Sequence, residues 1–301
     1  IAGILEHLEP AGVHSGDSTA VIPPFSINEE NLKEIKEKSK KLALGLNVKG
    51  LLNIQFAIKD EELFILEANP RASRTMPFVA KVTGNQIIKA GTLLMLGYSI
   101  DDVRNNTKYL SSSTNKVAIK KAIFPWSRFP AEDTMLGPEM KATGEVLGIG
   151  KKFGTALNKA YAAAGVEINN KGKGIFVTLS DDEKPNFIKT INKYLELGFT
   201  LYSTEGTGKF LKAKGIASEI VGKADDSGKT SLTIIEDKLI SLVINTPTFA
   251  NELSDGWKIR RLSHETGVAV VSSVREADAF IEAYLNKNLA LDDLEVIQDV
   301  S

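Results

Sequence analysis

Two runs rich in Leu, Ile and Phe, with three acidic residues between them, constrain the fold of this chain most strongly. The runs cover residues 51–59 and 63–69, and the acidic residues are 60–62. Short apolar runs separated by a polar cluster are typical of two antiparallel strands joined by a loop. A loop of three residues places Lys59 opposite Leu63. The sequence therefore predicts a β-hairpin with a defined register.

That register brings polar side chains together on one face of the hairpin. It places Gln55 opposite Glu67, and Asn69 shares the face of Glu67 because side chains alternate along a strand. Amide and carboxylate oxygens are hard ligands that suit Mg²⁺ or Mn²⁺. Arg71 and Arg74 follow, and guanidinium groups bind phosphate oxygens through paired hydrogen bonds. The hairpin is a candidate phosphate-handling site, although an ordinary amphipathic hairpin with its polar face in water fits the same spacing.

Composition limits the class of protein. The chain has 301 residues, of which 43% are hydrophobic and 25% are charged, and its formal net charge is -1. These values are typical of a globular protein with room for two domains, and nothing suggests a nucleic-acid surface. No run is long and apolar enough for a membrane span and no signal peptide is visible, so a cytoplasmic location is expected. The absence of cysteine excludes disulfides and thiolate nucleophiles.

The pattern of strands and helices changes near residues 150–172. Before it, hairpin strands mix with helical segments such as 31–46 and 85–96, which is an α+β pattern. After it, short β-rich runs alternate with helical spacings, which predicts a parallel sheet with covering helices. The predicted strands are residues 174–180, 200–203, 220–222, 242–246 and 268–272. Residues 169–174 have the composition of a connector.

A second candidate site lies in this later part. Residues 204–208 occur where a strand ends and a helix begins, so free backbone N–H groups and two hydroxyls would face an anion there. Lys223, Asn245 and Thr246 also follow strands, and the carboxyl ends of parallel strands share one edge of a sheet, where ligands bind. The pattern indicates a phosphate cradle, while a plain helix cap and turn also fits residues 204–208.

A histidine near the start, His14, lies in a loop-like segment, residues 10–18. Its surroundings EPAGVHSGDS, the hairpin NIQFAIKDEELFILEANPRASRT and the later KVTGNQIIKAGTLLMLGYS closely resemble the large subunit of carbamoyl phosphate synthetase. In that family two homologous ATP-grasp halves precede a small regulatory domain similar to methylglyoxal synthase. The order of motifs here, with GIFVTLS, STEGTGKFL and LVINT last, fits the second half plus that domain.

The resemblance implies a fold and a division of the chain. Residues 1–165 are expected to form the C-terminal part of the carbamoyl-phosphate ATP-grasp unit with its tail. Residues 166–301 are expected to form a parallel-sheet, methylglyoxal-synthase-like allosteric domain of the flavodoxin-like type. The overall class is therefore α+β followed by α/β. Since the chain also begins at Ile1 without an initiator methionine, we expect a fragment or processed product of a longer subunit.

The resemblance also implies roles for residues of the first part. The expected reaction is phosphorylation of carbamate by ATP to give carbamoyl phosphate, with ATP as substrate and Mg²⁺ or Mn²⁺ as cofactor. The implied metal ligands are Gln55, Glu67 and Asn69. Contacts with ATP are implied for His14, Ser15, Gln55 and Glu67, and the transferred phosphoryl group is expected near Arg71 and Arg74. Such chemistry requires positioning and charge neutralisation rather than a protein nucleophile.

For the second part, the resemblance implies a nucleotide monophosphate effector, with UMP expected. The implied effector residues are Thr178, Thr204, Thr207, Lys223, Asn245 and Thr246. Ornithine-activated relatives have an acidic residue and a Tyr-x-Thr where this chain has Lys121, Val270 and Ser272, so regulation by ornithine is not expected. Methylglyoxal synthase activity is not expected either, because no set of catalytic acids accompanies the hydroxyls.

Two alternatives and several partners accompany this interpretation. The chain could act only as an effector-binding module, or belong to another ATP-grasp ligase such as a biotin carboxylase relative, although those lack a methylglyoxal-synthase-like tail. A separate glutaminase small subunit and self-association into a homo-oligomer are the expected protein partners. Both pyrimidine and arginine synthesis remain open as pathways.

Overall fold

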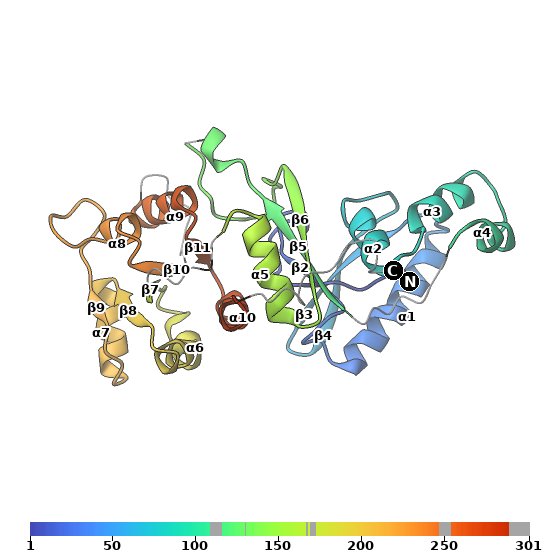
Figure 1. Ribbon diagram of the computed structural model, residues 1–301. Helices are drawn as coiled ribbons and strands as arrows, with labels where there is room; N and C mark the ends of the chain where they lie inside the picture. The colour runs from blue at the N-terminus through green and yellow to red at the C-terminus, as the bar shows by residue number, and fades with distance from the viewer. Residues whose placement is uncertain (109–115, 130, 167, 169–172, 247–253, 289–301) are drawn as a thin grey trace.

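The computed structural model describes residues 1–108, 116–129, 131–166, 168, 173–246 and 254–288. Within these residues the chain forms a four-stranded sheet, a two-stranded hairpin and a five-stranded sheet. Figure 1 shows the five-stranded sheet at one end of the molecule, the four-stranded sheet in the middle, and helices α1 to α4 at the other end. None of the described helices is both long enough and apolar enough to cross a membrane.

The four-stranded sheet is antiparallel, with the order β1-β2-β5-β6. Its strands are β1 (Glu6–His7), β2 (Ala20–Ile22), β5 (Val117–Ile123) and β6 (Gly144–Gly150), and a short 3-10 helix, η1 (Trp126–Arg128), follows β5. Helix α5 (Phe153–Ala163) lies across β5 and β6. A side chain at Gly148 would clash with the backbone of α5 at Ala156, so glycine permits this close approach.

The predicted hairpin is formed by β3 (Asn53–Lys59) and β4 (Glu62–Asn69). The predicted three-residue loop is wrong: Lys59 pairs with Glu62, and only Asp60 and Glu61 form the turn. Both turn residues have positive φ, 51° and 66°, which matches the right-handed twist of a two-residue hairpin.

A β-bulge restores the predicted register beyond the turn. Phe56 pairs with Ile65 but Gln55 pairs with Glu67, so Leu66 is the extra residue on β4. Gln55 and Glu67 are therefore opposite each other, as predicted, although the hairpin reaches this register by a different route.

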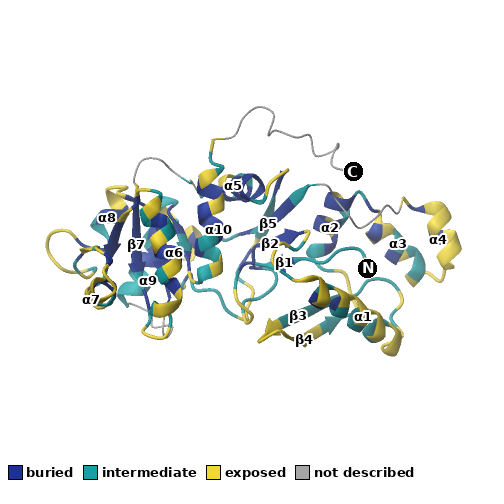
Figure 2. Cartoon of the chain, turned by 90° about the horizontal axis from the view of Figure 1, so that it is seen from below, coloured by how far each residue is buried: buried dark blue, intermediate teal, exposed yellow. Residues whose placement is uncertain are grey.

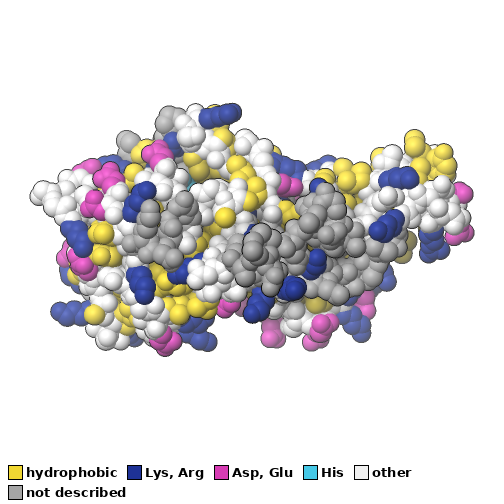
Figure 3. Space-filling view, viewed as in Figure 1, with side chains coloured by type: hydrophobic (Ala, Val, Ile, Leu, Met, Phe, Trp, Pro, Cys, Tyr) yellow, Lys and Arg dark blue, Asp and Glu magenta, His cyan; other side chains and the backbone are white. Residues whose placement is uncertain are grey.

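Helix α1 packs against the hairpin through β4, and three further helices contact one another in succession. These helices are α1 (Glu29–Gly45), α2 (Thr75–Thr83), α3 (Ile87–Met95) and α4 (Ile100–Asn106), so α1 and α3 confirm the predicted helical segments. Apolar side chains of Phe64, Ile65 and Leu66 on β4 are exposed. In Figure 2 the hairpin is coloured largely as exposed or intermediate, whereas the strands of the five-stranded sheet are coloured as buried. Figure 3 shows exposed apolar side chains at the end of the molecule formed by α3 and α4.

The five-stranded sheet is parallel throughout, as predicted, with the order β11-β10-β7-β8-β9. Its strands are β7 (Gly174–Thr178), β8 (Thr200–Ser203), β9 (Glu219–Ile220), β10 (Ile240–Asn245) and β11 (Ala269–Val271). Its helices are α6 (Lys184–Glu196), α7 (Glu205–Ala213), α8 (Thr233–Glu236), α9 (Asp255–Thr266) and α10 (Val274–Leu285). The order of the strands reverses between β7 and β10, which is a topological switch point of a doubly wound fold.

The helices cover both faces of this sheet. Phe187 of α6 and Phe280 of α10 belong to the cluster that includes Ile175, and Ile235 of α8 and Ile259 of α9 join the cluster on the other face. Because both faces of the sheet are covered, residues 174–177 of β7 are all buried, which explains why this strand is almost wholly apolar.

The two sheets are joined through a shared hydrophobic core. Helix α5 of the antiparallel part packs against α10 of the parallel part. Leu8 and Ile119 of the first sheet belong to the same buried cluster as Phe280 and Tyr284. Most of the predicted connector, residues 169–172, lies outside the described residues, so the division at residues 165 and 166 stays a prediction.

Candidate functional site

The polar face of the hairpin gathers four oxygen-bearing side chains. Gln55 is paired with Glu67 and Asn53 with Asn69, and all four occupy one face because they are two residues apart on each strand. Glu67 is exposed, and among the described residues no hydrogen bond or ion pair involves its carboxylate or the amide of Gln55. The donor set of one carboxylate with amide oxygens fits a hard divalent cation that also binds phosphate. Asn53 was not among the predicted site residues, although the predicted register already places it opposite Asn69.

A cavity of about 830 Å³ is lined by strand β3, whereas the predicted residues His14, Glu67, Asn69, Arg71 and Arg74 are not among its lining residues. Ser15 and Gln55 both line it, although they are 40 positions apart in the sequence, and Asn53 and Glu9 line it as well. The hairpin and the segment of His14 thus contribute to one concave space, as expected of a ligand site.

The loop that carries His14 and Ser15 is held by buried charged groups. The Lys120 ammonium donates to the carbonyl oxygens of Ser15 and Gly16, at 3.0 and 3.4 Å. The Asp17 carboxylate accepts hydrogen bonds from the backbone N–H groups of Lys141 and Ala142, at 2.8 and 2.9 Å. Burial lowers the pKa of Lys120, and nearby carboxylates, Glu145 first, oppose the change.

The imidazole of His14 has one nitrogen committed inside this loop. Its Nδ1 accepts a hydrogen bond from the backbone N–H of Gly16 at 3.0 Å. In the neutral ring the proton therefore lies on Nε2, which is left to donate to a ligand. The backbone of His14 is fixed too, because its N–H donates to the carbonyl of Gly137 at 2.8 Å.

The two predicted arginines occupy different surroundings. Arg74 caps the start of α2, and its Nη2 donates to the carbonyl of Ala142 at 2.9 Å. Arg71 is exposed, and its Nη1 donates to the neighbouring carbonyl of Ala72 at 3.0 Å. Arg74 is thereby tied to the segment that also supports Asp17, whereas Arg71 projects from the end of the hairpin.

A second cluster lies at the carboxyl ends of β7 and β10, at the switch point of the parallel sheet. Thr178 and Asn245 are paired across these strands. The N–H of Thr246 donates to the carbonyl of Thr178 at 3.1 Å, and the Thr246 hydroxyl accepts from the N–H of Ser180 at 2.8 Å. Ser180 is therefore a further member of this edge.

Helix α7 begins at the same edge. Thr204 is its N-cap, and the Thr204 hydroxyl donates to the Thr207 hydroxyl at 3.2 Å. Thr207 also accepts from the N–H of Leu179 at 3.1 Å, which joins α7 to the end of β7. The first N–H groups of a helix and its dipole favour an anion at this point.

Lys223 stands apart from the other predicted effector residues. It is exposed, and no hydrogen bond of its side chain to the described residues joins it to the five threonine and asparagine positions. Its charge does reach the start of α7: the pKa of Glu205 is lowered chiefly by a hydrogen bond from Lys209, and Lys223 adds to this effect. The structure brings five of the predicted residues together and places the lysine at the rim.

Arg260 is the group at this edge that sequence reasoning missed. Its Nη1 donates to the amide oxygen of Asn245 at 2.8 Å. An arginine in the middle of a helix is usually solvated, and nothing in the local pattern of α9 distinguishes Arg260 from an exposed residue.

Comparison with known proteins places these two clusters in a family. Residues 4–103 match the family model described as the carbamoyl-phosphate synthase L chain, ATP binding domain, and residues 186–272 match the MGS-like domain. The first match contains the hairpin and the His14 loop, and the second contains α6, α7 and α9.

Curated relatives match along almost the whole chain. The carbamoyl phosphate synthase large chain, C-terminal section, of Aquifex aeolicus is 40% identical over 94% of this chain and 55% of its own length. The corresponding section in Methanocaldococcus jannaschii is 40% identical over 94% of this chain and 47% of its own length. The large chain of Methanobrevibacter smithii is 44% identical over 98% of this chain and 28% of its own length. The chain thus spans about half the length, or less, of these relatives. Over almost its whole length the chain is therefore similar to the C-terminal portion of carbamoyl phosphate synthase large chains.

Proposed function

We propose that this protein is the part of a glutamine-dependent carbamoyl phosphate synthetase that phosphorylates carbamate with ATP. The observation that carries the proposal is the in-register pair of Gln55 and Glu67, of which Gln55 lines the same cavity as Ser15. The effector would bind at the edge of the parallel sheet, and ammonia would come from a separate glutaminase small subunit. Self-association into a homo-oligomer is part of the same proposal.

The side chains divide the work of phosphoryl transfer among them. Gln55, Glu67 and Asn69 would hold Mg²⁺ or Mn²⁺, and a cation there would neutralise charge on the phosphate oxygens. Arg71 and Arg74 would bind the phosphoryl group being transferred through their guanidinium forks. His14, with its proton on Nε2, would donate to a nucleotide oxygen beside Ser15. Each group positions or neutralises, and no covalent intermediate on the protein is required.

The test of catalysis is ATP formation from ADP and carbamoyl phosphate by the natural gene product that carries this sequence. We expect Glu67→Gln to lower the rate by about 100-fold or more, because it removes the single carboxylate of the donor set. Glu62→Gln is the matched control, since Glu62 lies on the same strand at the exposed turn.

A Glu67→Gln enzyme that keeps the parental rate contradicts the assignment of the hairpin. A chain that binds UMP but forms no ATP in its natural context supports the alternative, an effector-binding module without catalysis.

The effector site is proposed to bind UMP or a related nucleotide monophosphate through Thr178, Thr204, Thr207, Lys223, Asn245 and Thr246. The start of α7 supplies N–H groups and the two threonine hydroxyls face each other there. Ornithine is not expected to regulate the protein. This follows from the resemblance, because Lys121, Val270 and Ser272 stand where ornithine-activated relatives have an acidic residue and a Tyr-x-Thr.

Calorimetric titration with UMP tests the effector site. We expect saturable binding of UMP. Lys223→Ala is expected to weaken it by about tenfold or more, because the exposed ammonium of Lys223 would pair with the phosphate of the ligand. Lys212→Ala is the matched control, since Lys212 is exposed in the last turn of α7, away from the anion-binding end. Equal affinity in the two variants contradicts the site, and saturable heat with ornithine contradicts the exclusion of that ligand.

A further inference from the structure

The guanidinium of Arg260 connects two parts of the molecule. The residue is only 4% exposed and lies on α9, in the parallel-sheet part. Besides its bond to Asn245, its Nε and Nη2 donate to both carboxylate oxygens of Asp133, at 3.1 and 2.6 Å. Asp133 is in the connection between β5 and β6, in the antiparallel part. The buried guanidinium of Arg260 thus forms hydrogen bonds with Asn245 at the effector edge and with Asp133 in this connection at the same time.

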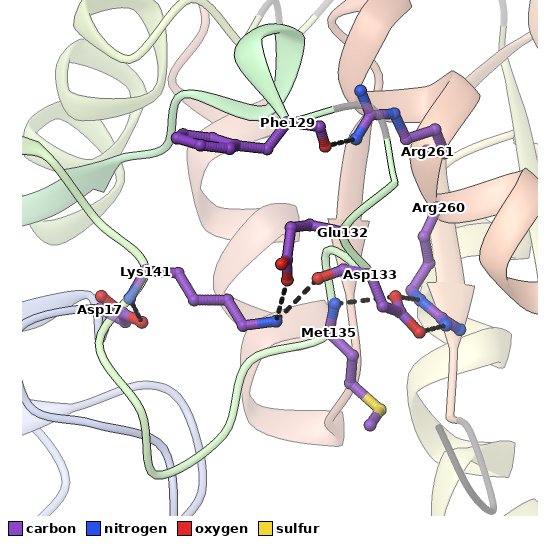
Figure 4. A network of polar contacts seen from close by, with 8 residues as sticks. All are labelled: Asp17, Phe129, Glu132, Asp133, Met135, Lys141, Arg260 and Arg261. Atoms are coloured by element: carbon purple, nitrogen blue, oxygen red, sulfur yellow. Dashed lines mark hydrogen bonds and ion pairs between the residues drawn. The ribbon is translucent and has the colours of Figure 1, made fainter. Parts of the chain in front are cut away.

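The segment of residues 131–142 begins at this ion pair and ends at the His14 loop. Figure 4 shows Arg260 and Asp133 facing each other, with Lys141 and Asp17 on the far side. Lys141 contacts both ends: its Nζ donates to the carbonyl of Asp133 at 2.9 Å, and its backbone N–H donates to the Asp17 carboxylate at 2.8 Å. The segment is therefore hydrogen-bonded to the effector edge at one end and to the catalytic loop at the other.

Three contacts make the far end relevant to catalysis. The N–H of Asp17 donates to the carbonyl of His14 at 2.9 Å, and the N–H of His14 donates to the carbonyl of Gly137 within the segment at 2.8 Å. Arg74 binds the carbonyl of Ala142 at 2.9 Å. Both a proposed ATP contact and a proposed phosphoryl contact therefore rest on residues 137–142.

The neighbouring arginine fixes the beginning of the same connection. Arg261 donates from Nη1 to the carbonyl of Phe129 and from Nη2 to that of Trp126, at 2.6 and 2.7 Å. With residues 126–129 anchored by Arg261, a change in the pairing of Arg260 acts on the part of the connection that follows, which is the part that supports His14.

We propose that Arg260 is the positioning residue through which a ligand at the effector edge changes the support of the His14 loop. The inference rests on the proposed function, because the ligand is taken to bind beside Asn245. A ligand that draws the amide of Asn245 toward itself removes one partner from a buried arginine. Leaving a buried guanidinium short of a partner is costly, so we expect the side chain of Arg260 to shift and its pair with Asp133 to shift with it. Coupling of this kind acts equally in both directions.

The test measures hydrogen exchange of the Lys141 and Ala142 amides by NMR, since both amides bind Asp17. In the chain without ligand, we expect Arg260→Gln to speed this exchange by about tenfold, because the support of the segment is lost. Arg275→Gln is the matched control: Arg275 also joins the two parts, through the carbonyl of His7 and the hydroxyl of Ser26, but does not touch residues 131–142.

A second variant with a smaller structural change tests the proposal even if Arg260→Gln does not fold. Gly256→Ala keeps every charge, and its new methyl group would lie 3.0 Å from Arg260 Nη1 and 3.7 Å from Asn245 Nδ2. We expect it to speed the same exchange by about threefold, since it disturbs only the Asn245 contact. Unchanged exchange at Lys141 and Ala142 in both variants overturns the proposal.

The same measurement in the presence of UMP distinguishes a failure of this inference from a failure of the proposed function. When UMP is added to the parental chain, we expect exchange at Lys141 and Ala142 to change, and the change to disappear in Gly256→Ala. UMP that binds by calorimetry but leaves both amides unaltered overturns the coupling. If UMP does not bind, the proposed effector has failed, and the ligand-free variants still decide whether Arg260 supports the segment.

Discussion

Charged side chains inside the protein hold the loop of His14 and Ser15 in place. Lys120 is only 2% exposed and Asp17 only 1%, yet each is satisfied, Lys120 by two carbonyls and Asp17 by two backbone N–H groups. Removing one partner of such a pair is costly because it leaves a buried charge uncompensated. Lys120 and Asp17 thereby fix the backbone of the loop that carries His14 and Ser15.

The carboxyl group of Glu9 makes the stability of the folded state depend on pH. Its carboxylate accepts from the N–H and hydroxyl of Thr19, at 2.6 and 2.8 Å. Burial first, and then the charge of Glu276, raise the pKa of Glu9 to about 7, while Lys121 opposes them. The folded state then holds a proton that the unfolded state loses near pH 4.5. Stability contributed by this group is present at low pH and is lost as the pH rises toward 7.

We therefore expect Glu9→Gln to remove a decline in stability between pH 5 and pH 8 of on the order of 1–2 kcal/mol. Chemical denaturation at the two pH values measures it, with Glu30→Gln, an exposed residue at the start of α1, as control. The same slope in Glu9→Gln and in the parental chain would show that Glu9 is charged at both pH values.

At the scale of elements, the hairpin shows how a local irregularity serves a site. A two-residue turn alone would have placed Glu67 out of register with Gln55, and the extra residue Leu66 corrects this. The turn itself is strained, because Asp60 and Glu61 have positive φ and neither is glycine. The hairpin thus combines an imperfect turn with a bulge that determines which side chains meet.

Glu61→Gly is expected to stabilise the hairpin by about 0.5–1 kcal/mol, since glycine adopts positive φ without a steric cost. Hydrogen exchange of the β3 and β4 amides measures this local stability. Glu62→Gly removes the same charge one residue later, where the backbone is already in the strand, and is expected to destabilise the hairpin. Equal effects of the two substitutions would mean that the turn conformation is not as described.

Local patterns predicted the elements but not every contact between them. The alternation in residues 174–272 was sufficient for the parallel sheet, and the polar alternation in residues 51–69 was sufficient for the face that carries Gln55 and Glu67. The turn was mispredicted because a run of three acidic residues does not distinguish a two-residue loop from a three-residue loop. Such errors are confined to a few residues and follow from turn chemistry.

At the scale of the whole molecule, the residues that prediction missed are those with distant partners. Lys120 binds the carbonyls of Ser15 and Gly16, which precede it by 105 and 104 positions in the sequence. Arg260 binds the carboxylate of Asp133, which precedes it by 127 positions. A lone lysine or arginine in the sequence gives no sign of such partners, and both types are usually exposed. The family resemblance supplied the residues proposed to bind ligands, whereas the groups that support and connect them emerged only from the three-dimensional arrangement.

The packing of α5 against α10 bears on how this protein could be recombined with its relatives. The two helices come from opposite sides of the predicted division, yet their side chains occupy one continuous core. A chimera that exchanges residues 166–301 alone would join an α10 from one parent to an α5 from another, leaving mismatched surfaces at the junction. The unit that can be exchanged is therefore larger than residues 166–301, and it begins at α5 or earlier.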